Sequence, residues 1–176
     1  LALDQRGHGD SDWAPDGDYS LEAHQRDIHG FVQAAGLEWF VLIGLSLGGR
    51  NGLVYTATHP EGVRALVIVD VGPETRRDGR LQIREFVTTT DELDSVEAFA
   101  RRAQQHNPRR PISQLMGSLR WNLKQLPNGK WTWKYDKLLR TPGYRIPGGS
   151  REYLWDCATR LSCPTLVVRG GESLVL

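Results

Sequence analysis

The sequence predicts an α/β protein in which a mostly parallel sheet is interrupted by an inserted helical cap. Strands and helices alternate along the first part of the chain, and the predicted strands are short continuous apolar runs such as residues 40–43 and 65–69. Such runs are typical of parallel strands with helices on both faces, so the sheet is predicted to be doubly wound. From residue 71 to about residue 160, helical spacing of apolar residues replaces these runs, which predicts the cap.

The elements of the predicted sheet can be placed by their start and stop signals. Ser20 is predicted to cap a first helix, and Gly36 to end it. A second helix follows the strand at 40–43 directly and is stopped by Pro60. Strands are predicted at residues 1–3, 40–43, 65–69 and 165–168.

The predicted cap contains its own signals. Asp94 followed three residues later by Glu97 resembles a capping box, and Pro108 would close the helix that it starts. Residues 127–129 (Pro-Asn-Gly) predict a turn. The aromatic residues after the turn alternate with polar ones, which predicts a short extended edge: Trp131, Trp133 and Tyr135.

We therefore expect three consecutive parts: a core at 1–73, the helical cap at 74–160, and a returning core strand at 161–176. The chain opens and closes inside apolar runs, which favours an internal fragment of a longer protein. No charged-then-apolar signal opens it, which favours a cytoplasmic protein.

Composition excludes several classes of function. The chain has 176 residues, 39% hydrophobic and 24% charged, and a formal net charge of +1, which favours neither nucleic acid nor an acidic membrane surface as a partner. No apolar run approaches the length of a membrane span. Cys157 and Cys163 fit neither a disulfide framework nor a zinc site, so we expect no metal. The oligomeric state stays open.

A Gly-x-Ser-x-Gly motif joins a predicted strand to a helix at residues 44–48. This pattern holds a serine at a strained, exposed position in a tight turn, so Ser46 is predicted to be a nucleophile. At the start of the helix, the backbone N–H of Leu47 is predicted to bind a developing oxyanion.

A dinucleotide-binding unit is the alternative, because the next predicted strand also ends at an acidic residue, Asp70. That fingerprint requires Gly-x-Gly-x-x-Gly, however, and here Ser46 stands where its second glycine would let a pyrophosphate approach. The glycine spacing therefore favours the nucleophile.

The sequence DQRGHGDS at residues 4–11, together with GLSLGG at residues 44–49, closely resembles the α/β-hydrolase superfamily, of the AB hydrolase-1 type. The resemblance implies that the first motif follows the fourth strand and Ser46 the fifth. It implies no organic cofactor and no metal. His8 is structural in this resemblance.

The position of the acid departs from the usual pattern of the superfamily, which has an Asp three residues after the glycine ending the seventh strand. Ser173 occupies that position, and Glu172 is one residue too early. The combination of Val-Asp-Val-x-Pro at residues 69–73 with Arg-Gly-Gly-x-Ser at 169–173 resembles short-acyl esterases and thioesterases that place the acid after strand six. Asp70 is therefore the expected acid and Glu172 the alternative.

The resemblance places the base histidine after an eighth strand, beyond Leu176. The other histidines are interpreted as exposed structural residues: His24, His29, His59 and His106.

The expected reaction is hydrolysis of a carboxylic ester or thioester, with a small acyl compound as substrate and an acyl-Ser46 intermediate. Hydrolysis of a carbon–carbon bond by the same residues and a non-catalytic ligand-binding role are the alternatives. The remaining aromatic residues of the cap region are candidates for its core or for an acyl pocket: Trp121, Trp131, Trp133, Tyr135 and Trp155.

Overall fold

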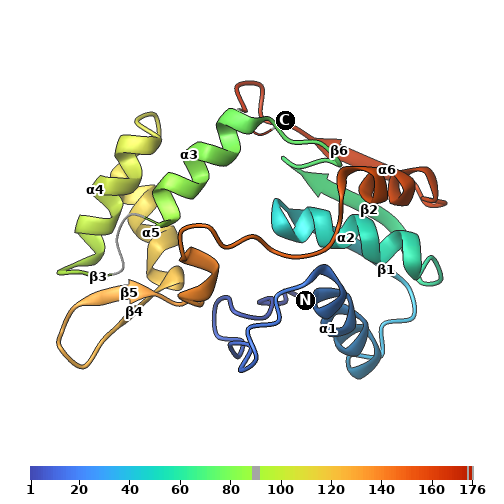
Figure 1. The fold of residues 1–176 in the computed structure, drawn as a ribbon, viewed down its shortest axis with the longest axis horizontal. Helices are drawn as coiled ribbons and strands as arrows, with labels where there is room; N and C mark the ends of the chain where they lie inside the picture. The colour runs from blue at the N-terminus through green and yellow to red at the C-terminus, as the bar shows by residue number, and fades with distance from the viewer. Residues whose placement is uncertain (89–91, 174, 176) are drawn as a thin grey trace. The chain divides into compact units, whose positions relative to one another are not determined.

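A computed structural model of the protein describes residues 1–88, 92–173 and 175. The helices are α1 (Leu21–Ala34), α2 (Leu47–Thr58), α3 (Arg77–Thr88), α4 (Val96–His106), α5 (Ile112–Asn122) and α6 (Arg151–Thr159), with a 3-10 turn η1 (Leu138–Arg140). The strands are β1 (Phe40–Leu45), β2 (Val63–Val69), β3 (Glu92–Leu93), β4 (Leu123–Gln125), β5 (Trp131–Trp133) and β6 (Thr165–Val168) (Figure 1).

The described chain forms two compact units. One contains Leu1–Gly17 and Leu81–Arg145, and the other contains Asp18–Arg80 and Ile146–Leu176. The division into a core at 1–73 and 161–176 and a cap at 74–160 stays a prediction.

The second unit is built on a parallel sheet with strand order β1-β2-β6. Leu45 is paired with Val69, and Val69 with Val168, so the three strands end side by side. Leu66 and Ile68 of β2 are buried in a core with Leu53 of α2 and Leu154 of α6, while Ile28 and Val32 of α1 pack with Tyr55 of α2. The α/β class and the parallel sheet are therefore confirmed.

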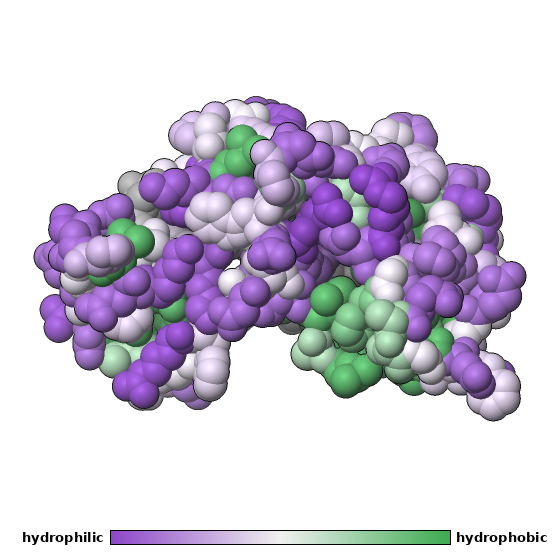
Figure 2. Space-filling view, turned by 90° about the horizontal axis from the view of Figure 1, so that it is seen from below, coloured by the Kyte–Doolittle hydropathy of each residue, from purple (hydrophilic) through white to green (hydrophobic). Residues whose placement is uncertain are grey.

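The helices α1, α2 and α6 pack on the sheet face that carries Leu42, Leu66 and Ile68. On the opposite face of β1, the alternate residues Val41, Ile43 and Leu45 are 55%, 67% and 65% exposed. Apolar side chains also gather into one large patch on the face shown in Figure 2.

The predicted strand at residues 1–3 is wrong, because these residues form no strand and none of the described strands pairs with them. A strand depends on ladder hydrogen bonds, which an apolar run alone does not supply.

The first unit contains an antiparallel sheet with strand order β3-β5-β4. The predicted turn at 127–129 is confirmed by the hydrogen bond from Gly129 N–H to the Leu126 carbonyl, 2.9 Å. β5 is the central strand of this sheet rather than an edge, and its Trp133 packs with Phe99 of α4 in the core of the unit.

The capping residue of α4 is Ser95, not Asp94 as the sequence suggested. Ser95 Oγ accepts a hydrogen bond from the Ala98 N–H at 3.1 Å, and its backbone is extended, with φ −156° and ψ 163°. A capping side chain must directly precede the first helical residue. The first residue of α4 is Val96, so the cap is Ser95 and not Asp94.

Candidate active site at the carboxyl ends of the strands

Ser46 lies between the last residue of β1 and the first residue of α2, with φ 50° and ψ −116°. The turn is so tight that a Cβ atom on Gly44 would collide with the Gly48 carbonyl and lie 2.5 Å from the Gly49 nitrogen. A Cβ atom on Gly49 would lie 2.8 Å from the Gly44 carbonyl oxygen. The glycines of the motif are therefore required by close backbone packing, which forces the strain onto Ser46.

The hydroxyl group of Ser46 is not used in capping its helix. Ser20, Ser95 and Ser150 also occupy N-cap positions, and each accepts a hydrogen bond from the backbone N–H three residues later. Ser46 has positive φ instead of their extended or near-extended backbone, and its side chain makes no such bond. The Ser46 side chain is thus exposed at the helix N-terminus and has no hydrogen-bond partner within the described part of the chain.

Leu47 is the first residue of α2. The first N–H groups of a helix have no acceptor inside that helix, and they lie at the positive end of its dipole. The Leu47 N–H therefore has the direction and polarity of an oxyanion donor next to Ser46.

Asp70 directly follows β2 and has φ 54°. Its backbone N–H donates to the Val168 carbonyl at 2.8 Å, which holds it against the end of β6. Its Oδ1 atom is buried and has no hydrogen-bond partner among the described residues. A buried carboxylate oxygen without a donor needs an explanation, and a group that joins the site later would supply one.

Glu172 lies beyond β6 in a turn closed by the hydrogen bond from Ser173 N–H to the Gly170 carbonyl, 3.0 Å. The side chain is exposed, in contrast to the partly buried Asp70. The roles of Ser46, Leu47, Asp70 and Glu172 stay predictions.

The histidines of the described chain lie on other elements. His8 Nδ1 lies 3.1 Å from the Arg6 carbonyl oxygen, and the His8 ring stacks on Tyr135 with 5.8 Å between centroids. His59 caps the far end of α2, a helix of 12 residues and thus about 18 Å long at about 1.5 Å per residue. His29 and His106 are exposed, but His59 is partly buried and His24 is 1% exposed, so the expectation of an exposed side chain is wrong for His59 and His24. Helical position alone did not show how closely α1 packs on its neighbours.

Two charged residues near the site were not singled out from the sequence. Arg50, in the first turn of α2, donates to the carbonyl groups of Gly148 and Gly149, and burial lowers the pKa of its guanidinium while nearby Glu22 opposes that change. Glu74 accepts a hydrogen bond from Trp155 Nε1 at 2.9 Å. Their only signal in the sequence is that each stands four positions after a predicted catalytic residue, Ser46 or Asp70.

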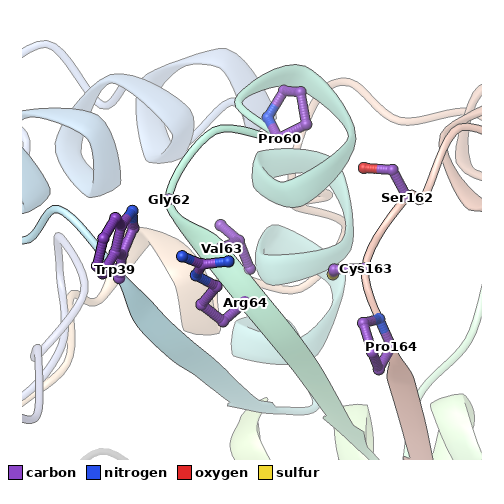
Figure 3. A pocket seen from close by; sticks show the side chains of 8 residues that line it. All are labelled: Trp39, Pro60, Gly62, Val63, Arg64, Ser162, Cys163 and Pro164. Atoms are coloured by element: carbon purple, nitrogen blue, oxygen red, sulfur yellow. The ribbon is translucent and has the colours of Figure 1, made fainter.

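A pocket of about 370 Å³ lies at the opposite end of the parallel strands (Figure 3). It is lined by residues that precede or open β1, β2 and β6, including Trp39, Arg64 and Pro164, and Arg64 Cζ lies 4.5 Å from the centroid of the Trp39 ring. Because parallel strands share one direction, this pocket is at the amino ends and Ser46 at the carboxyl ends. It is therefore separate from the candidate active site.

The aromatic residues that the sequence assigned to a cap differ in their burial. Trp133 is 5% exposed and belongs to the core of the first unit, together with Trp131 and Tyr135. Trp121 and Trp155 are 78% and 48% exposed. The described residues contain no group of three or more His, Cys, Asp or Glu side chains that could hold a metal ion. None of the helices, as far as they are described, has the length and apolar character needed to cross a membrane.

Comparison with known proteins shows which family, relatives and solved structures the chain is similar to. The chain matches the family model described as the alpha/beta hydrolase fold over residues 1–175. It is 33% identical to the esterase Rv0045c of Mycobacterium tuberculosis, over 98% of this chain and 58% of that protein. It is 27% identical to the sn-1-specific diacylglycerol lipase of Mus musculus, over 98% of this chain and 56% of that protein.

Among solved structures, an alpha/beta hydrolase from Novosphingobium aromaticivorans matches with a TM-score of 0.82 and 28% identity, covering 98% of this chain and 63% of that one. A thioesterase domain from the curacin biosynthetic pathway matches with a TM-score of 0.73 and 19% identity, which shows a shared fold. The chain spans little more than half the length of the curated relatives that it matches over nearly all of its own residues.

Proposed function

This chain belongs to the alpha/beta hydrolase fold family, and from that premise we propose that the protein hydrolyses a carboxylic ester or thioester through an acyl-Ser46 intermediate. The observation that carries the proposal is the conformation and exposure of Ser46. Its side chain is exposed at a strained helix start, and its hydroxyl group is not used for capping. Strain of this kind costs stability and persists where function uses it.

The chemistry that follows is a two-step acyl transfer. Ser46 Oγ attacks the carbonyl carbon of the substrate while a base takes its proton, and the negative charge that develops on the carbonyl oxygen is stabilised by the Leu47 N–H. The C–O or C–S bond then breaks, and the base returns the proton to the leaving alcohol or thiol. Water hydrolyses the acyl-Ser46 ester by the same route. The base is proposed to be a histidine outside residues 1–176.

Asp70 is the proposed partner of that histidine. Its buried, unpaired Oδ1 at the end of β2 can accept a hydrogen bond from an imidazole N–H, which would fix the tautomer and stabilise the imidazolium ion. The exposed side chain of Glu172 offers less of this stabilisation, because solvent weakens charge interactions. The burial of the two carboxylates therefore favours Asp70.

Relatives support an ester or thioester as the bond that is cleaved, since the Mycobacterium tuberculosis protein is named an esterase and the Mus musculus protein a diacylglycerol lipase. A carbon–carbon hydrolase would use the same residues and differs only in its products. A ligand-binding protein of this fold would leave Ser46 unmodified by acylating reagents.

A fluorophosphonate probe on the full-length protein tests the proposal. Covalent labelling that maps to Ser46 and is abolished in Ser46→Ala is the expected result, together with a burst of alcohol release from an activated ester. A burst retained by Ser46→Ala would contradict it. Stable binding of an ester without labelling would favour the non-catalytic alternative, and product analysis would identify carbon–carbon cleavage.

A further inference from the structure

The two loops that carry Ser46 and Asp70 are both tied to one short segment, from Gly148 to Trp155. We infer that this segment positions the two residues relative to each other, with Arg50 as the contact from the Ser46 side and Glu74 as the contact from the Asp70 side. The inference rests on the proposed function. All of these residues belong to the second unit.

Arg50 makes the first connection. Its Nη2 atom donates to the Gly148 carbonyl at 2.5 Å and to the Gly149 carbonyl at 3.2 Å. Its Nε atom is buried and has no hydrogen-bond partner within the described residues, so the guanidinium is partly withdrawn from water where it makes these two bonds. In addition, the Arg50 backbone N–H donates to the Ser46 carbonyl at 3.0 Å. Arg50 thus connects the backbone at Ser46, the proposed nucleophile, to Gly148 and Gly149.

The two glycines are built for this close approach. Gly148 and Gly149 have φ values of 80° and 69°, which side chains rarely adopt. A Cβ atom on Gly149 would collide with the Arg50 guanidinium, and one on Gly148 would lie 2.9 Å from Leu21 Cβ. The preceding Pro147 carbonyl accepts the Leu21 N–H at 3.0 Å, which fixes the segment to the start of α1. The segment is therefore a fixed surface against which Arg50 is held.

Glu74 makes the second connection, four residues after Asp70. One oxygen of its carboxylate, Oε1, accepts a hydrogen bond from Trp155 Nε1 at 2.9 Å and pairs with Arg151 Nη2 at 2.6 Å. The side chains of Arg151 and Glu74 are 65% and 47% exposed, so the ion pair by itself contributes little stability. The two contacts nevertheless connect Glu74 to α6, because Arg151 and Trp155 both lie in the first two turns of that helix.

The helix α6 can serve as a common support because it is packed in the core. Leu154 and Cys157 are 5% and 0% exposed and lie in one cluster with Leu53 of α2 and Ile68 of β2. Ser46 and Asp70 are both strained, and strained residues keep their conformation only where the surroundings hold them. A displacement of about 1 Å at such a site lowers turnover up to about a hundredfold. Arg50 and Glu74 are therefore positioning residues rather than catalytic residues.

Kinetics of the full-length protein provide the test, with Arg50→Met, Arg50→Lys and Glu74→Gln as variants. We expect kcat for an activated ester to fall about tenfold in Arg50→Met and about threefold in Glu74→Gln, with KM unchanged. Arg50→Lys retains a cation that can donate to one carbonyl group, so it should recover part of the loss. The matched controls are Arg26→Met and Glu38→Gln, which alter exposed charges away from the segment and should keep wild-type kcat.

Hydrogen exchange makes the test independent of catalysis. The amide groups of Ser46 and Asp70 donate to the Val69 and Val168 carbonyls, so they are protected in the folded protein. They should exchange several-fold faster in Arg50→Met and Glu74→Gln, respectively, than in the two controls. Wild-type kcat and wild-type exchange in both variants would overturn the inference, as would equal losses in the controls. If the wild-type protein is not labelled at Ser46, the proposed function fails, and the exchange rates alone decide whether the segment positions these loops.

Discussion

Ser46 and Asp70 directly follow the paired ends of two adjacent parallel strands, and both have left-handed backbone conformations. Leu45 pairs with Val69, and the Ser46 N–H donates to the Val69 carbonyl at 3.0 Å. Of the non-glycine residues that the structure describes, these are the ones with positive φ, at 50° and 54°. Two strained residues side by side at the carboxyl ends of a parallel sheet are the reason that we propose this edge as the active site.

The strain at Ser46 predicts a gain in stability when its side chain is removed entirely. Glycine adopts positive φ without the steric cost that any other residue has there, which is about 1 kcal/mol or more. Ser46→Gly should therefore be more stable than Ser46→Ala by about 1 kcal/mol. Urea unfolding of both variants of the full-length protein measures the difference, and equal midpoints would show that the turn is unstrained.

A side chain added at Gly44 is expected to lower the stability of the protein. A Cβ atom there would collide with the backbone of Gly48, and backbone cannot move aside as a flexible side chain can. Gly44→Ala should destabilise the protein by more than about 3 kcal/mol, a loss reserved for severe packing defects. Gly30→Ala is the control, because Gly30 lies in α1 with nothing within 4 Å of its added Cβ, and it should stabilise by about 0.5–1 kcal/mol. Thermal unfolding compares the two, and similar melting temperatures would contradict the close packing of the turn.

The acid can be identified by two amide substitutions in the full-length protein. Asn tolerates positive φ, so Asp70→Asn should keep the fold, but its side chain cannot stabilise an imidazolium ion and kcat should fall about 10³–10⁴-fold. Glu172→Gln should change kcat by less than about threefold, because that side chain is exposed. Ester hydrolysis measures both, and the reverse order of effects would assign the acid to Glu172.

The histidines of α1 and α2 predict a pH dependence of stability. Burial lowers the pKa of His59 below its usual 6.5, and the charge of His29 lowers it further, while the Tyr55 carbonyl and Glu61 act in the opposite direction. The His29 and His59 rings stack with 4.6 Å between centroids. The unfolded state therefore binds a proton at His59 more tightly than the folded state does. The contribution of neutral His59 to stability is complete above its usual pKa, and it is lost as the pH falls below that pKa.

Unfolding free energies between about pH 8 and about pH 5 test this prediction. His59→Gln should flatten the loss of stability at acid pH relative to the wild-type protein. An unchanged slope in His59→Gln would show that this histidine does not titrate with folding.

Local sequence patterns were enough to predict the strands of the parallel sheet and the turn at Ser46. Continuous apolar runs gave β1, β2 and β6, and the glycine spacing gave the strand-to-helix turn, since only glycine tolerates the close backbone approach at Gly44 and Gly49. These features are local, because each depends on residues close in the chain. The same local rules failed at residues 1–3, where strand formation depends on a pairing partner elsewhere.

Which side chains meet at the strand ends depends on long-range packing and could not be read from the sequence. Arg50 and Glu74 contact the segment at Gly148–Trp155, which is far from both in the sequence. The burial of Asp70 Oδ1 and of His24 likewise depends on residues elsewhere in the chain. No periodicity or motif encodes these features. The surroundings of Asp70, Arg50 and Glu74 depend on how α6 packs against α2 and how β6 aligns with β2, and the burial of His24 depends on how α1 packs on its neighbours. The conformation of Ser46 is thus set by local backbone geometry, while the surroundings of this proposed nucleophile are set by packing across the sheet.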